Sequence, residues 1–133
     1  MSETAEQELL RANEAFYDAF DRRDIEAMDE LWAHHTGVAC VHPGWPPLLG
    51  RDDVMASWRE LLLGASSPRV RCDRANAVLL GASGFVTCLE HLENGTLVAT
   101  NTFCLEDGIW QLVHHQAGPL EIDEDEADGT LLN

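Results

Sequence analysis

The chain has 133 residues, 45% of them hydrophobic, which suffices for one globular domain with a single core. Its formal net charge of −16 repels nucleic-acid phosphates and anionic membrane surfaces, so we expect neither as a partner. No apolar run approaches the roughly 20 residues that span a bilayer, and residues 1–6 lack the basic and apolar segments of a signal peptide. We therefore expect a cytoplasmic protein.

The N-terminal third of the chain predicts two helices. Residues 4–7 have the pattern of a capping box, and apolar side chains then recur at helical spacing, which predicts a helix over 5–22. Asp24 can cap a second, short helix whose apolar face ends at Trp32. The His-His-Thr-Gly segment at 34–37 terminates this second helix.

A short strand and a third helix follow. Residues 38–42 are mostly β-branched or small and predict a strand, which the proline-rich segment 43–47 cannot continue because prolines lack backbone donors. Asp52 can cap a third helix, and Gly64 is a natural end for it.

The second half of the chain predicts a meander of antiparallel strands. After Pro68 the pattern alternates with a period of two, and strands fit at about 69–80, 84–93, 96–106 and 109–116. The dipeptides at 94–95 (Asn-Gly) and 107–108 (Asp-Gly) are typical of type I′ hairpin turns, which need positive φ at both central residues.

This element order predicts an α+β fold in which three N-terminal helices pack on a strongly curved, mainly antiparallel sheet. We assign residues 1–120 to a single domain. Residues 121–133 contain six acidic side chains and little to bury, so we expect a disordered tail.

Three polar side chains fall on strand faces that should point at the core. Asn101 interrupts an apolar face of its strand, His114 continues the face of Trp110 and Leu112, and His42 ends the face of the first strand. A buried polar group without a partner costs about 1–3 kcal/mol. Each of the three is therefore either hydrogen-bonded within the protein, or they line a cavity together.

Aromatic residues are candidate walls of such a cavity. Trp45 lies in a stiff apolar loop and is interpreted either as a lid over the sheet or as a plug at the edge of the core. Trp58 has the helical spacing of a core residue, and Trp110 is a further candidate ligand contact. Glu90 could act as an acid or base if it were buried, but it lies near a hairpin end, where we expect it to be exposed.

The sequence supports neither a metal nor a cofactor. Its four cysteines are far apart and form no C-x-x-C pair, which favours free, mostly buried thiols. His114 and His115 are strand neighbours that point to opposite faces and should not chelate one ion together. No glycine-rich phosphate loop is present, and Ser57 has no nucleophile elbow around it.

Local motifs add a family resemblance. They occupy residues 12–17, 41–45, 50–58, 99–103 and 110–115 and include His-Pro-Gly-Trp and Trp-x-x-Val-His. Together with the element order they resemble SnoaL-like proteins of the NTF2-like superfamily. Residues 113–119 are also similar to the association domain of calcium/calmodulin-dependent kinases. The resemblance implies a cone with a pocket at its open end and dimerisation through the outer sheet face, but no single activity.

Two functions stay open at this point. Dehydratases of the superfamily pair two pocket histidines with an acid and a tyrosine, which implies His42 and His114 as the pair and leaves the acid unassigned. Ketosteroid isomerases of the superfamily use a tyrosine of the first helix, which implies Tyr17 as a candidate ligand contact. The first function is a small-molecule lyase or isomerase with His114 as the acid/base, His42 and Asn101 orienting the ligand and Trp45 closing the site. The alternative is a non-catalytic association module that packs Val98, Ile109 and Val113 against a second copy.

Overall fold

The computed structural model describes residues 3–121, so the acidic tail beyond Glu121 lies outside the described residues. The helices are α1 (Ala5–Arg22), α2 (Ile25–Leu31) and α3 (Arg51–Leu63). The strands are β1 (Ala39–Val41), β2 (Leu48–Leu49), β3 (Arg71–Leu80), β4 (Ser83–Leu92), β5 (Gly95–Glu106) and β6 (Ile109–Pro119).

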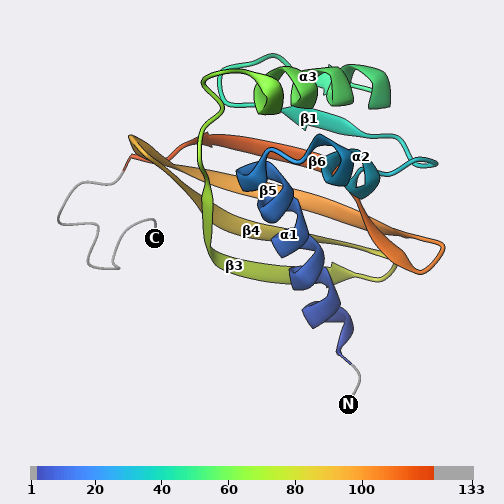
Figure 1. Cartoon of the computed structure of the whole chain (residues 1–133). Coiled ribbons are helices and arrows are strands. Elements are labelled where there is room, and N and C mark those ends of the chain that lie inside the picture. The colour runs from blue at the N-terminus through green and yellow to red at the C-terminus, as the bar shows by residue number, and fades with distance from the viewer. Residues whose placement is uncertain (1–2, 122–133) are drawn as a thin grey trace.

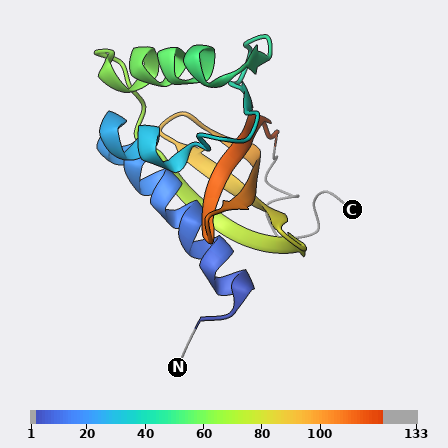
Figure 2. The ribbon, with the colours of Figure 1, turned by 90° about the vertical axis from the view of Figure 1, so that its right-hand side faces the viewer.

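The strands form one sheet in the order β2-β1-β6-β5-β4-β3. All neighbours pair antiparallel except β1 and β6, which are parallel. Helix α1 crosses one face of this sheet, and α3 lies beside β1 (Figure 1). Viewed from the side, the sheet bends around α1 without closing into a barrel (Figure 2). The predicted α+β fold, three helices on a curved and mainly antiparallel sheet, is thus confirmed.

The helix starts follow local chemistry, with one correction. The Thr4 side chain accepts from the Gln7 amide, and Asp24 caps α2, as predicted. The prediction that Asp52 caps α3 is wrong, because Gly50 is the N-cap, with a φ of 87°. Only glycine adopts that conformation without strain, and it turns the chain from β2 into the helix. Asp52 instead lies in the first turn, where its carboxylate interacts favourably with the helix dipole.

One of the two predicted hairpin turns has the expected form. Asp107 and Gly108 both have positive φ, 53° and 80°, which confirms a type I′ turn. Gly95 instead belongs to β5 and pairs with Leu92, so the loop residues are 93 and 94, and neither has positive φ. The type I′ prediction at Asn-Gly is therefore wrong, since the pairing shifted by one residue.

A β-bulge in β6 decides which histidine faces inward. Thr102 of β5 pairs with His114, whereas the next residue, Phe103, pairs with Leu112, which leaves Val113 as an extra residue in β6. An extra residue reverses the alternation of side chains beyond it. His115 is consequently buried on the inner face, and the prediction that His114 continues the face of Leu112 is wrong.

The core lies between α1, α3 and the inner face of the sheet. Phe16 and Phe20 of α1 pack edge-to-face on Trp58 of α3, with ring centroids 5.5 and 5.1 Å away. Arg51 fixes α3 to α2 by donating to the backbone oxygens of Asp29 and Trp32. No helix within residues 3–121 has the length and apolar character needed to cross a membrane.

Candidate functional site

A cavity of about 160 Å³ opens at the end of the sheet where β4 meets β5. Most of its wall is apolar, and three of its lining side chains are polar and titratable. The lining residues are Phe20, His42, Pro43, Trp45, Leu61, Pro68, Glu90, Leu92, Leu97 and His115. His42, Glu90 and His115 are at most 3% exposed, so each is a buried polar group at a cavity surface.

Three different strands bring these groups together. Glu90 shares the inner face of β4 with Val86 and Cys88, as strict alternation requires. His115 lies opposite Asn101 of β5 and opposite Cys40 of β1. His42 comes two residues after Cys40, just beyond the end of β1, and its ring centroid is 6.2 Å from that of His115.

Tyr17 of α1 fixes the Glu90 carboxyl by a hydrogen bond. The Tyr17 hydroxyl donates to Glu90 Oε2 over 2.6 Å. Burial raises the pKa of Glu90, and this hydrogen bond opposes the rise only in part. Burial, followed by the nearby Glu90 charge, raises the pKa of Tyr17 as well, so the phenol keeps its proton and remains a donor.

A buried amide determines where His115 carries its proton. Asn101 Nδ2 donates to Asn13 Oδ1 at 2.9 Å and to the Tyr17 oxygen at 3.0 Å, which leaves Oδ1 free to accept. His115 Nδ1 lies 2.5 Å from that oxygen and must therefore carry the hydrogen. Burial lowers the pKa of His115 to about 3, so the ring is neutral. Its Nε2 keeps a lone pair, 4.0 Å from Glu90 Oε2.

His42 is fixed by a different chain of hydrogen bonds. The Ser57 hydroxyl donates to the Val54 carbonyl oxygen at 2.6 Å and so accepts from His42 Nε2 at 2.9 Å. Burial lowers the pKa of His42 to about 4. The proton of Ser57 is thus already committed to the helix backbone, and the residue does not line the cavity, so a serine nucleophile is not available here.

The loop after β1 places an indole over the cavity. Trp45 N donates to the His42 carbonyl oxygen at 2.9 Å, closing a turn with Pro43 and Gly44 at its centre. Gly44 has a φ of 81°, typical of a type II turn with proline before glycine. The Trp45 ring then packs edge-to-face on His42, with centroids 5.0 Å apart.

The structure brings some of the predicted site residues together and separates others. His42 and Trp45 line the cavity, while Asn101 and Tyr17 lie behind it and reach its polar groups. Trp58 is a fully buried core residue that touches His42.

Two predicted residues lie elsewhere. Trp110 lines a separate hollow together with Leu31 and Ile109. His114 Nδ1 bonds the Ala39 carbonyl oxygen at 3.1 Å, outside the cavity.

Sequence reasoning missed Glu90 and His115. The exposed position expected for Glu90 is wrong, because it is 1% exposed. Its alternation with Val86 and Cys88 was the signal that could have found it. For His115 the sequence gives no comparable signal, since the bulge at Val113 is not marked by glycine or proline.

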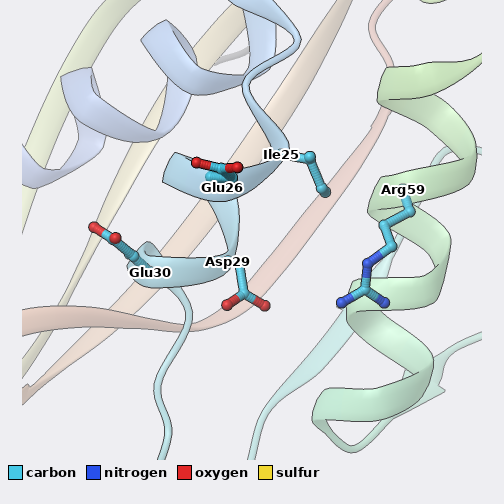
Figure 3. Close-up of a pocket in the computed structure, with 5 residues that line it drawn as sticks. All are labelled: Ile25, Glu26, Asp29, Glu30 and Arg59. Carbon is cyan, nitrogen blue, oxygen red and sulfur yellow. The ribbon is translucent and has the colours of Figure 1, made fainter.

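The hollow between α2 and α3 is larger, about 390 Å³, but carries no buried reactive group. Glu26, Glu30 and Arg59 are exposed side chains there (Figure 3). Asp29 is paired with Arg51 at 2.9 Å. Within residues 3–121 no cluster of three His, Cys, Asp or Glu side chains could hold a metal ion. The cavity beside Glu90 is therefore the candidate site.

Comparisons with known proteins agree with this architecture. The family model of the SnoaL-like domain matches residues 9–120. A candidate dehydratase of the NTF2-like family from Streptomyces avermitilis superposes with a TM-score of 0.79 and 31% identity, covering 88% of this chain and 96% of that one. A candidate calcium/calmodulin-dependent protein kinase type II association domain from Thiobacillus denitrificans superposes with a TM-score of 0.74 and 32% identity. The match covers 83% of this chain and 93% of that one.

A curated plant protein is also similar. The F-box protein SKIP8 of Arabidopsis thaliana is 25% identical over 118 residues, which cover 87% of this chain and 51% of that protein. The chain thus spans about half the length of this relative.

Replacing Glu90 with glutamine tests the buried carboxyl. A raised native pKa stabilises the fold below the unfolded value of about 4.5, and this stabilisation is lost as the pH rises through the native pKa. The free energy of unfolding of Glu90→Gln, relative to wild type, should therefore increase with pH by about 1.4 kcal/mol per unit of pKa elevation. Urea titrations from acidic to neutral pH measure it. The exposed control Glu93→Gln should give a flat difference, and a flat difference for Glu90→Gln contradicts the burial cost.

Replacing Asn101 with leucine tests the tautomer of His115. Without the amide oxygen, the Nδ1 hydrogen loses its acceptor, and the proton should move to Nε2, which faces the cavity on the side of Glu90. Nitrogen-15 NMR of the imidazole distinguishes the two forms. Thr100→Val, on the same strand, should keep the Nδ1–H form of wild type. Persistence of Nδ1–H in Asn101→Leu would show that the amide does not set the tautomer.

Proposed function

The chain belongs to the SnoaL-like domain family of the NTF2-like superfamily, and we propose that its cavity moves a proton on a small organic molecule in a lyase or isomerase reaction. One observation carries the proposal: a neutral histidine and a buried carboxyl, 4.0 Å apart, face the same cavity. The similarity to a candidate dehydratase supports the lyase branch of this proposal.

The two groups divide the work of a general base and a general acid. His115 Nε2 has a lone pair and takes a proton from a carbon next to a carbonyl group. Glu90, whose raised pKa favours the protonated form, gives its proton to a departing hydroxyl group. The C–H and C–O bonds break, a C=C bond forms and water leaves. Transfer of the proton from His115 to Glu90 then restores the starting state.

In this proposal His42 and Trp45 position the ligand and take no part in proton transfer. Ser57 fixes the ring of His42 through Nε2, and Trp45 packs against that ring at the rim of the cavity. A ligand held between them is oriented toward His115, and water is displaced from the apolar wall. Positioning of this kind supplies a large share of catalysis when the reacting atoms are already in contact.

The alternative of a purely non-catalytic association module does not account for the site. Assembly through an outer sheet face needs no carboxyl and no neutral histidines at an inner cavity. Burying such groups costs free energy that apolar side chains of similar size would not cost. The acid–base pair is therefore the observation that favours an enzyme.

Adjacent histidines provide a matched test of the proposed base. His115→Gln should lower turnover by roughly 10²–10⁴-fold, the usual contribution of a general base, whereas His114→Gln should retain it. The assay follows loss of water from small β-hydroxy ketones, and double-bond migration in the matching enones, by ultraviolet absorbance. Equal turnover in both variants, or loss only in His114→Gln, contradicts the assignment of His115.

We also propose that a second copy covers the outer face of the sheet. Val78 and Val98 lie there and are 41% and 43% exposed, and the half-buried Val113 lies at the bulge of β6. Ile109, the first residue of β6, is 60% exposed. Sedimentation at micromolar concentration should show a dimer, and Val98→Arg should yield monomers while Glu93→Gln leaves the dimer intact. A wild-type monomer contradicts this arrangement.

A further inference from the structure

We infer that the cavity selects uncharged, ring-sized molecules that carry a hydroxyl or carbonyl group, and that it excludes their anionic counterparts. The inference rests on the proposed function for the location of the site. It adds the class of ligand, which neither the fold nor the family fixes. Three features of the cavity carry it: its size, the charges around it and its hydrogen-bonding atoms.

The size of the cavity limits the ligand to about one ring. Its volume of about 160 Å³ is far below the roughly 300–1,000 Å³ of pockets for drug-sized ligands. An apolar cavity of about 150 Å³ holds benzene. Phe20, Leu61 and Leu97 supply walls of that character here.

The charges around the cavity disfavour an anion. None of the lining residues is an arginine, and the chain contains no lysine. The two arginines that flank the rim at Pro68 are already engaged: Arg69 pairs with Asp21 through two hydrogen bonds, and Arg23 donates to the Ser67 carbonyl oxygen. Among the lining side chains, Glu90 is the one that becomes an anion when it ionises, and the formal net charge of −16 adds to the same field.

The hydrogen-bonding atoms suit a neutral hydroxyl or carbonyl group. His115 Nε2 can only accept in its neutral tautomer, and a ligand hydroxyl can donate to it. The Glu90 carboxyl, 4.0 Å away, can donate to a ligand oxygen while protonated. A ligand carboxylate in the same place would face the lone pair of His115 Nε2 and the carboxyl group of Glu90. No cation lines the cavity to offset the free-energy cost of removing that carboxylate from water.

Benzamide and benzoate form a matched pair of probes, because they have the same ring and nearly the same shape but differ in charge. At neutral pH, benzamide should bind wild type at least about tenfold more tightly than benzoate, a difference worth about 1.4 kcal/mol. Protein NMR titrations give both dissociation constants, and the shifts should be confined to lining residues such as Phe20, Trp45 and Leu97. As the pH rises through the pKa of Glu90 and the carboxyl ionises, the preference for benzamide should grow by about tenfold in wild type and in Glu93→Gln, but not in Glu90→Gln.

Several outcomes would overturn the inference. One is that benzoate binds as tightly as benzamide, which would indicate that a histidine takes up a proton and pairs with the carboxylate. Another is that neither probe binds at millimolar concentration. A preference for benzamide that grows with pH in Glu90→Gln as much as in wild type would also overturn it. These results are independent of turnover: selective binding without activity would refute the proposed reaction alone, and activity with preferred anion binding would refute the ligand class alone.

Discussion

The hydrogen bonds of the Asn101 amide are the constraint on which the site depends. This one side chain donates to Asn13 and Tyr17 of α1 and accepts from His115 of β6, so it joins the helix to two strands of the sheet. The Asn101 amide is buried and its hydrogen bonds are directional. Its neighbours therefore have one arrangement in which each of these polar groups has a hydrogen-bond partner. Tyr17 is then positioned to hold Glu90, and His115 is left with its lone pair toward the cavity.

The small side chain of Ala99 in β5 leaves room for Glu90 and His115 to approach each other. The pairing of β4, β5 and β6 places Ala99 on the inner face between the positions of Glu90 and His115. Because Ala99 has only a methyl group, the carboxyl and the imidazole approach each other above it to 4.0 Å. A larger residue there would fill the space that the two groups share, so the packing of the sheet and the chemistry of the site impose the same requirement on this position.

The fold could be predicted from the sequence because its signals are local. The capping box at Thr4 and the positive-φ turn at Asp107 and Gly108 depend only on neighbouring residues, and both were predicted correctly. Asn101 was also placed correctly, since alternation along an unbroken strand determines its face. The site was harder, because the bulge at Val113 arises from pairing with β5 and reverses the alternation that pointed to His114. Proximity to a hairpin was a poor guide to Glu90, whose exposure depends on α1 and on Tyr17.

In the proposed reaction, the environment of Glu90 and His115, rather than their residue types, separates the roles of the two groups. Burial acts in opposite directions on them: it lowers the pKa of His115 to about 3 and raises the pKa of Glu90, so both favour their uncharged forms. An uncharged histidine is a base, and an uncharged carboxyl is an acid. A water-filled cavity would reverse both effects, since solvation would let the carboxyl ionise and the imidazole take up a proton. In the proposed reaction, the apolar wall and the indole of Trp45 therefore support the acid–base pair, because apolar surroundings favour the uncharged form of each group.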